Sequence, residues 1–328
     1  MPMPLCRRLI SSSSRCAALT LALLVTSLLP VACDSGNTPS TGSPARTGEK
    51  AAKGAGLQVF ASNAPLAYFA KRIGDAAVTV SVPPPVDIDP AFWQPTAEDI
   101  ATMQAADLVI LNGAGFEHWR SQVSLVERTV IETAEGFKAA WIETRDGVTH
   151  SHGTEGAHSH AGTAFTTWLD PDQAIEQARA IHARLAALLP DQATDLQARF
   201  MGLERDLRTL NGQFESAIGS SNGLPLVFSH PIYQYFIRRY ELNGRSLHWE
   251  PEEMPSESEL TAFAHLLKEH PAKWMVWEDE PGQAIRSKLR ELGVECVVVA
   301  PASNMGPDWE RWLERQIENA TQFAKVFE

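Results

Sequence analysis

The residues with the clearest capacity for chemistry are four histidines in one short stretch. Residues 150–160 read HSHGTEGAHSH. Imidazole is largely neutral near pH 7 and coordinates divalent metals, so this stretch can collect metal ions weakly and release them below about pH 6 as the rings take up protons. The alternative interpretation is a solvated insertion that holds no ligand. The four candidates for an auxiliary metal-capture loop are His150, His152, His158 and His160.

The rest of the composition argues for a binding protein rather than an enzyme. The formal net charge of −12 argues against nucleic acid as a partner. Neither a metalloprotease motif of the HExxH type nor a GxSxG serine motif is present, and no glycine loop is arranged to cradle phosphate. Three of the four cysteines lie within the first 33 residues, and Cys296 lies in the apolar run ECVVV, where an inert core position is typical.

The N-terminal end has the features of a secretion signal. Residues 1–32 contain three arginines, no acid and an apolar run of residues 17–29 that is short for a membrane span of about 20 residues. Small residues ahead of Cys33 resemble a lipoprotein signal, although Pro30 stands where an aliphatic residue is usual. We expect a lipid anchor on Cys33 that holds the body on the extracytoplasmic side of the membrane. Ordinary cleavage just before Cys33 and an uncleaved anchor are the alternatives.

The elements that must position a site are short apolar runs separated by helical stretches. Such alternation predicts parallel strands and an α/β fold. The sequence offers Thr96 with Asp99, and Ser256 with Glu259, as N-terminal capping pairs for two helices that each lead to a strand. We therefore predict two similar lobes. The runs begin at Leu57, Ala77, Asp107, Leu224, Lys273 and Cys296.

One long amphipathic helix should join the lobes. Apolar residues recur at spacings of three and four beyond Pro190, which should end or kink the preceding helix. A helix of about 28 residues is roughly 40 Å long and can fix the separation of two lobes. The predicted divisions are a signal at 1–32, a flexible tether at 33–56, a first lobe at 57–189 with a His-rich loop at 148–163, a linking helix at 190–219, and a second lobe at 220–328.

Four segments carry a resemblance to a known family. They read VPPPVDIDPAFWQPTAEDI, DLVILNGAGFEHW, TWLDP and FSHPIYQYFIRRY. The chain from Leu57 onward resembles the metal-binding substrate-binding proteins of bacterial ABC importers for zinc and manganese. That resemblance implies two lobes joined by a rigid helix, an ion between the lobes, and a histidine-rich loop ahead of the TWLDP motif.

Most of the metal ligands that the resemblance implies are replaced. The family's first two histidines fall on Ala91 and Thr166, and its late aspartate falls near Ala300. The third histidine falls on His230 and is present, although a hydrogen-bonded histidine in a turn after a strand is the alternative interpretation. The family's usual set of ligands therefore cannot form.

Other second-lobe residues are candidates to complete a modified site. His248 and Glu250 alternate in LHWEPEE and would share a face of an extended chain, and Glu278 directly follows a predicted strand. Asp87 and Asp89 lie beside Ala91. The alternative interpretation of both glutamates is a helix cap or a salt bridge. The predicted metal ligands are His230, Glu278, Glu250 and His248.

With this resemblance, we predict a monomeric solute-binding lipoprotein that captures a divalent metal and delivers it to an ABC importer permease. Zinc is the favoured metal and manganese is the second candidate. Four tryptophans lie near the expected cleft. One interpretation is that they pack the lobes together, and the alternative is that they stack on an organic ligand. The alternative function is therefore binding of a metal chelate or organic ligand, or an adhesive or regulatory role at the surface. These tryptophans are Trp93, Trp168, Trp249 and Trp277.

Overall fold

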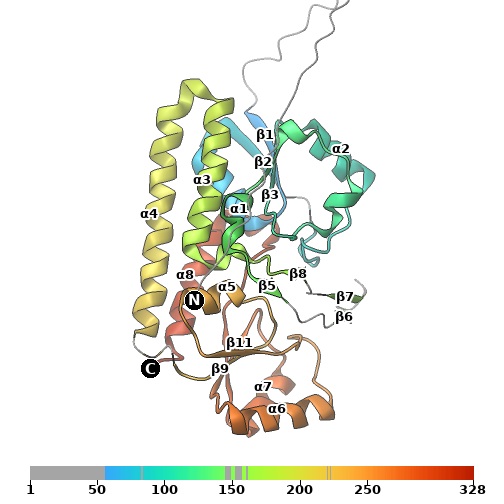
Figure 1. Ribbon diagram of the computed structural model, residues 1–328, viewed down its shortest axis with the longest axis vertical. Helices are drawn as coiled ribbons and strands as arrows, with labels where there is room; N and C mark the ends of the chain where they lie inside the picture. The colour runs from blue at the N-terminus through green and yellow to red at the C-terminus, as the bar shows by residue number, and fades with distance from the viewer. Residues whose placement is uncertain are drawn as a thin grey trace, which may run out of the picture. The chain divides into compact units, whose positions relative to one another are not determined.

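The first lobe is built on a four-stranded parallel sheet (Figure 1). Its strand order is β2-β1-β3-β4. The computed structural model describes residues 56–82, 84–144, 162–219, 221 and 223–328, together with the backbone of residues 149–151 and 157–159. The strands are β1 (Leu57–Ala61), β2 (Val78–Ser81), β3 (Leu108–Leu111) and β4 (Val130–Glu132).

Helices cover both faces of this first sheet. The Asn63 side chain accepts a hydrogen bond from the Leu66 N–H and so caps α1 (Ala64–Gly74). The predicted capping box of Thr96 and Asp99 is confirmed at the start of α2 (Ala97–Ala105). α2 packs with the outer face of the sheet in one apolar cluster, and α1 packs with the inner face in another.

The second lobe repeats this plan with the strand order β10-β9-β11-β12, again all parallel. The predicted capping box of Ser256 and Glu259 is confirmed at the start of α6. α6 and α7 cover the outer face of the sheet, whereas α5 and α8 lie on the inner face (Figure 1). The elements are β9 (Leu226–Phe228), α5 (Gln234–Arg239), β10 (Gly244–Ser246), α6 (Glu257–Glu269), β11 (Trp274–Trp277), α7 (Gln283–Glu291), β12 (Glu295–Val298) and α8 (Trp312–Ala324).

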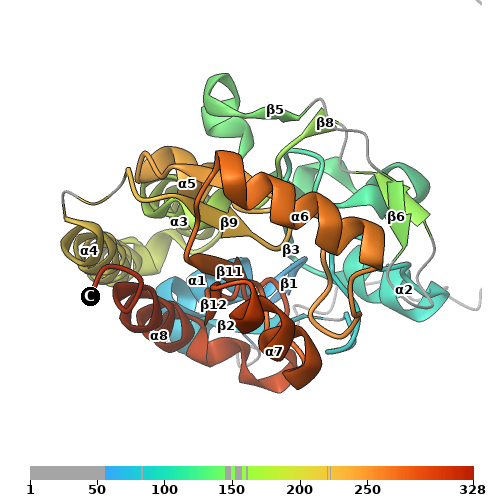
Figure 2. The same cartoon turned by 90° about the horizontal axis from the view of Figure 1, so that it is seen from below.

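One long helix, α4, links the lobes, and α3 of the first lobe precedes it. α3 (Pro171–Leu188) ends before Pro190, as predicted, and α4 (Ala193–Ile218) follows with 26 residues, a length of about 39 Å at 1.5 Å per residue. α4 packs on α1 and α3 of the first lobe and on α8, beside which it lies in Figure 2. The predicted apolar stripe is fully buried and consists of Leu196, Phe200, Leu203, Leu207, Leu210, Phe214 and Ile218.

One apolar core therefore continues from lobe to lobe. The α4 stripe shares a single cluster of buried residues with strands β1 and β3 of the first lobe and strands β9 and β11 of the second. Because this core is continuous, separating the lobes would expose apolar surface along the whole of α4. The predicted α/β fold with two similar lobes and a linking helix is confirmed.

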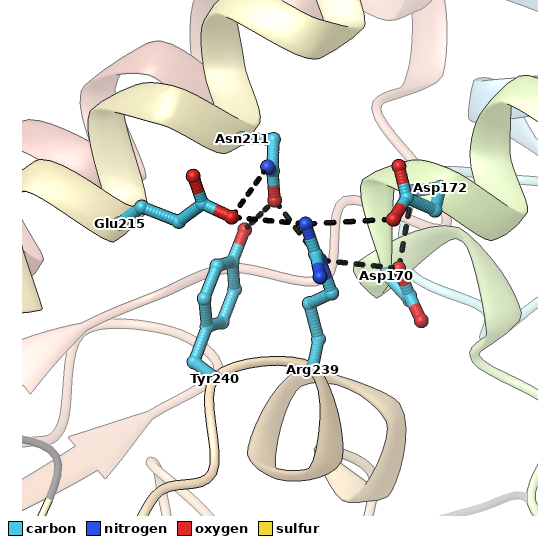
Figure 3. A network of polar contacts seen from close by, with 6 residues as sticks. All are labelled: Asp170, Asp172, Asn211, Glu215, Arg239 and Tyr240. Atoms are coloured by element: carbon cyan, nitrogen blue, oxygen red, sulfur yellow. Dashed lines mark hydrogen bonds and ion pairs between the residues drawn. The ribbon is translucent and has the colours of Figure 1, made fainter.

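A network around Arg239 holds the lobes together beside α4 (Figure 3). The Arg239 guanidinium donates to the Asn211 side chain at 3.1 Å and pairs with Glu215 at 3.0 Å, both on α4. It also pairs with Asp172 at 3.4 Å in the first turn of α3. Burial raises the pKa of Asp170, the residue that caps α3 and lies 3.8 Å from Arg239.

Further hydrogen bonds cross between the lobes. The Asn304 amide, after β12, donates to the Pro85 and Ile88 carbonyls at 2.6 and 2.9 Å. The Trp168 indole donates to the Pro301 carbonyl at 2.9 Å. The lobes are therefore joined by these bonds as well as by the Arg239 network.

Two short antiparallel pairs lie at the His-rich segment. β5 (Glu143–Thr144) pairs with β8 (Gly162–Thr163), and β6 (Thr149–Ser151) pairs with β7 (Ala157–Ser159). In the part of the chain that the structure describes, no helix is both long and apolar enough to cross a membrane. Cys33, the signal and the tether lie outside the described residues.

Candidate metal-binding site

His230 lies at the carboxyl end of β9 and is 2% exposed. The backbone around it is fixed by two hydrogen bonds of Ser229, whose N–H donates to the Val276 carbonyl and whose carbonyl accepts from the Trp249 N–H, both at 2.8 Å. The ring is therefore held at the end of the sheet where ligands gather in open parallel folds.

Glu250 and Glu278 meet His230 at this end of the sheet. Glu278 directly follows β11, and Glu250 follows β10 by four residues. The Nδ1 atom of His230 lies 3.4 Å from Oε1 of Glu250. One potential ligand atom from each of the three residues lies within 4.8 Å of the other two. Two carboxylates and an imidazole at this spacing can coordinate one divalent ion.

His248 lies beside this group but is not one of the three. Its half-buried ring has its centroid 5.7 Å from that of His230, at an interplanar angle of 71°. The structure thus brings three of the four predicted ligands together and leaves His248 next to them. Their assignment as ligands remains a prediction.

A cavity of about 60 Å³ adjoins His230 and Glu278 between the lobes. Its opposite wall, from the first lobe, consists mostly of aromatic rings, with Asp89 as the acidic side chain. The residues in this wall include Phe92, Phe116, Phe165, Trp168 and Asp89.

The positions at which the family resemblance placed further ligands serve other purposes. Ala91 is fully buried in the core, and its carbonyl accepts from the His118 N–H at 3.3 Å. The Thr166 hydroxyl donates a short hydrogen bond to the Ile232 carbonyl and so joins the lobes at the cavity wall. Ala300 is held by hydrogen bonds of both its N–H and its carbonyl to the Asn319 side chain, at 3.0 and 2.7 Å.

The carboxylate of Glu278 contributes to the raised pKa of a buried tyrosine, Tyr233. The Tyr233 hydroxyl is buried and donates to the Val299 carbonyl at 2.9 Å. Burial, and secondarily the negative charge of Glu278, raises the pKa of Tyr233 well above its usual value. This phenol therefore stays protonated and acts as a structural donor.

Four tryptophans were predicted near the cleft, and the structure places them in different surroundings. Trp168 lines the cavity, whereas Trp93, Trp249 and Trp277 are buried in the outer cores of the two lobes. Sequence reasoning missed Phe92 and Phe165 as lining residues. Their place in the sequence could have identified them, because Phe92 follows Ala91 and Phe165 precedes Thr166, two positions where the resemblance placed a lost ligand.

The His-rich segment is only partly described. The backbones of His150 and His158 are paired in register in the β6–β7 pair. His152 and His160 lie outside the described residues. The auxiliary metal-capture loop therefore remains a prediction.

Two parallel α/β lobes on a linking helix, with a cavity between them that is lined by His230 and Glu278 at strand ends, have the architecture of a two-lobed solute-binding protein. A family model described as zinc-uptake complex component A, periplasmic, matches residues 59–326, and the chain belongs to this family. Membership makes it a non-enzymatic component that binds a divalent metal for an ABC importer.

Individual relatives are distant. The chain is 25% identical over 284 residues to the high-affinity zinc uptake system protein ZnuA of Bacillus subtilis, a match that covers 83% of this chain and 84% of the relative. It is 22% identical to the zinc-binding lipoprotein AdcA of Streptococcus pneumoniae, covering 76% of this chain and 50% of that protein. The solved structure of the Pseudomonas aeruginosa protein FpvC in complex with Mn²⁺ matches with a TM-score of 0.67 at 21% identity, over 82% of this chain and 98% of that one, which supports the fold alone.

Proposed function

We propose that the protein captures one zinc ion between its lobes and delivers it to the permease of an ABC importer. His230, Glu250 and Glu278 are the proposed ligands. The observation that carries this proposal is the approach of three donor atoms, one from each residue, to within 4.8 Å of one another. They come from three neighbouring strands of one sheet, so the fold holds them together before an ion arrives.

Electrostatics favours occupation by a cation. Two carboxylates beside one another repel, and a partly buried site weakens the solvent screening of that repulsion. A divalent cation balances the two negative charges and replaces repulsion with attraction. The buried imidazole of His230 supplies a nitrogen donor in its neutral form.

Zinc is the favoured ion. A site with one nitrogen and two carboxylate groups binds zinc more tightly than manganese, because affinity rises along the first-row divalent series from manganese towards copper and zinc. The high oxygen content narrows that preference, so manganese is the second candidate.

The surrounding features extend this proposal. His248 is the proposed fourth protein ligand or a neighbour that orients the site, and the His-rich loop is a proposed weak collection site for the same ion. A lipid on Cys33 and the tether at 33–56 would anchor a monomeric body on the extracytoplasmic side. Its relative AdcA, a zinc-binding lipoprotein of Streptococcus pneumoniae, supports this anchoring.

Calorimetric titration of the full chain, stripped of metal, tests the proposal. We expect one zinc per chain, and we expect His230→Ala to weaken binding by more than about 100-fold because a ligand is lost. His265→Ala, an exposed histidine on α6, is the matched control and should bind like the parent. A parent that binds no zinc below millimolar concentration would overturn the function, and an unaffected His230→Ala would overturn the site.

A second candidate function is capture of a metal chelate. The specific observation in its favour is the aromatic wall opposite His230 and Glu278. The aromatic rings of this wall supply no ligand atom to a bare ion but give apolar contact to an organic molecule.

A further inference from the structure

A loop of the second lobe is hydrogen-bonded to the first lobe. Residues 301–304 follow β12 and carry four of the hydrogen bonds that cross between the lobes. The Ser303 carbonyl accepts from the Ala64 N–H at 2.8 Å. The Pro301 carbonyl and the Asn304 amide make the other three bonds, at 2.9, 2.6 and 2.9 Å. The partners of the loop in the first lobe are Ala64, Pro85, Ile88 and Trp168.

The chain passes from the second lobe to the first at the start of this loop. Directly before it, both the N–H and the carbonyl of Ala300 are bonded to the Asn319 side chain of α8. Shortly after it, Gly306–Arg311 form a short 3-10 helix that packs on α1 of the first lobe. Within the loop Ala302 has a φ of 55°, a left-handed conformation that residues other than glycine seldom adopt. Such a conformation persists where the surroundings fix it, as the hydrogen bonds on either side do here.

The same loop forms part of the cavity wall. Pro301 and Ser303 line the cavity with His230, and Trp168, which donates to Pro301, lines it from the first lobe. Asn304 is outside the lining, so its amide acts on the loop and not on the contents of the cavity. Movement of the second-lobe sheet away from the first lobe at this wall must either break the four bonds or pull the loop away from its own lobe.

We propose that residues 301–304 form a latch that controls how fast the ion enters and leaves the cavity, with Asn304 as its main positioning residue. This inference rests on the proposed capture of a metal ion between the lobes. The Asn304 amide donates to two carbonyls of the first lobe, and its Oδ1 accepts from the Gly306 N–H at 3.0 Å, which orients the side chain. The latch bonds involve none of the proposed ligands, so they stabilise the closed cavity equally with and without the ion. A latch of this kind changes the rates of capture and release together and leaves the affinity unchanged.

Stopped-flow kinetics of the full chain test the latch. Release is followed by mixing the zinc-loaded chain with excess chelator, and capture by mixing the metal-free chain with buffered zinc. We expect Asn304→Ala to speed both by about 10-fold, because two lost hydrogen bonds raise the population of the open cavity by about that factor. The equilibrium affinity for zinc should stay within about threefold of the parent. Rates equal to those of the parent would overturn the latch, and so would an affinity that falls as far as the release rate rises.

Two control variants separate the latch from a general loss of stability. Asn243→Ala removes an amide that donates to the Gly223 carbonyl at 3.1 Å within the second lobe, and it should keep the rates of the parent. Leu289→Val removes volume from the buried core under α7, so it should lower the free energy of unfolding and still keep the rates. Rates raised as much in Leu289→Val as in Asn304→Ala would assign the effect to weakened folding and overturn the latch.

Hydrogen exchange of the metal-free chain tests the opening of the latch without zinc. The Ala64 N–H donates to the Ser303 carbonyl, so it exchanges when the latch opens. Its exchange should quicken by about 10-fold in Asn304→Ala and stay at the parent's rate in Asn243→Ala. Tight zinc binding with unchanged zinc rates and unchanged exchange of Ala64 would overturn the latch and leave metal capture in place. A parent that binds no zinc would overturn both the proposed function and this control of ion exchange.

Discussion

The two lobes have the same framework and use it differently. In the first lobe the Ser62 N–H donates to the Ile110 carbonyl, and in the second the Ser229 N–H donates to the Val276 carbonyl, at the same place between the two central strands. By this correspondence Asn63 in the first lobe matches His230 in the second. Continuing the register by two residues, Asn112 matches Glu278.

The first-lobe residues are engaged within their own lobe. Asn63 caps α1, and the Asn112 amide donates to the Phe165 carbonyl at 2.9 Å. The buried carboxylate of Glu117 accepts from the Ser62 hydroxyl and from the Asn112 N–H, both at 2.6 Å. The matching second-lobe residues face the cavity instead.

The comparison teaches that the fold supplies the place and individual residues supply the chemistry. Parallel strands end at the same edge in both lobes, so both edges can carry ligands. In this chain the first lobe uses its strand ends for internal hydrogen bonds and aromatic contact, and the three proposed ligands lie on the second lobe. Substitutions in each lobe therefore measure how far zinc binding and stability depend on different residues.

The largest effect is expected from the second lobe. Glu278→Gln removes a charged ligand and leaves the shape of the side chain, and zinc affinity should fall by more than about 100-fold. Glu280→Gln, a neutralisation two residues further on at an exposed glutamate, should bind within about threefold of the parent because its charge pairs with Arg286. Calorimetry measures the zinc affinity of both variants. Similar losses of affinity in both would mean that net charge, and not a lost ligand, causes the effect.

The first-lobe carboxylate of Glu117, which accepts from the Asn112 N–H, should affect stability rather than zinc. Burial raises the pKa of Glu117 from 4.5 to about 7, although hydrogen bonds from Ser62, Asn112 and Gly113 oppose the shift. The native state therefore holds this proton more tightly than the unfolded state. The stabilisation is present in full below pH 4.5 and is lost as the pH rises to about 7.

Urea unfolding between these pH values checks the sign. Relative to Glu117→Gln, the parent should lose about 3 kcal/mol of unfolding free energy as the pH rises through this window. Glu98→Gln, an exposed glutamate on α2, should keep the pH profile of the parent. If the parent instead becomes more stable relative to Glu117→Gln as the pH rises, burial does not favour the protonated form of Glu117.

A smaller effect is expected where Thr166 joins the lobes. Thr166→Val keeps the shape but leaves the Ile232 carbonyl without this donor, at a cost of about 1–3 kcal/mol in unfolding free energy. Thr321→Val removes an exposed hydroxyl that bonds within its own helix and should cost no more than about 0.5 kcal/mol. Equal costs, measured by urea unfolding, would mean that the inter-lobe bond contributes nothing.

The smallest effect is expected from the His-rich stretch. Deletion of residues 150–160 should leave zinc affinity within about threefold of the parent, because the proposed ligands lie elsewhere. Titration of the deletion variant measures this directly. A loss of more than about 10-fold would assign a ligand to the loop.

The fold was largely predictable because its strands and helices carry strong local patterns. The apolar runs at β1, β2, β3, β9, β11 and β12, both capping boxes and the α4 stripe are explicit in the sequence. The edge strands β4 and β10 were missed. β10 reads Gly-Arg-Ser and has no apolar run, because an edge strand with exposed side chains needs none.

The site was less predictable because it depends on contacts between distant segments. Glu278 was a candidate from its position after a predicted strand and Glu250 from its alternation with His248, but their approach to His230 requires the strand order β10-β9-β11. The roles of Phe92 and Phe165 depend on how the lobes face each other across the cavity. No local pattern encodes that arrangement.

An anomalous-difference map of a zinc-soaked crystal tests the central claim most directly. We expect a peak at about 2.0–2.2 Å from an imidazole nitrogen of His230 and from carboxylate oxygens of Glu250 and Glu278. A peak confined to residues 145–161, or no peak beside His230, would contradict capture of the ion by the second lobe.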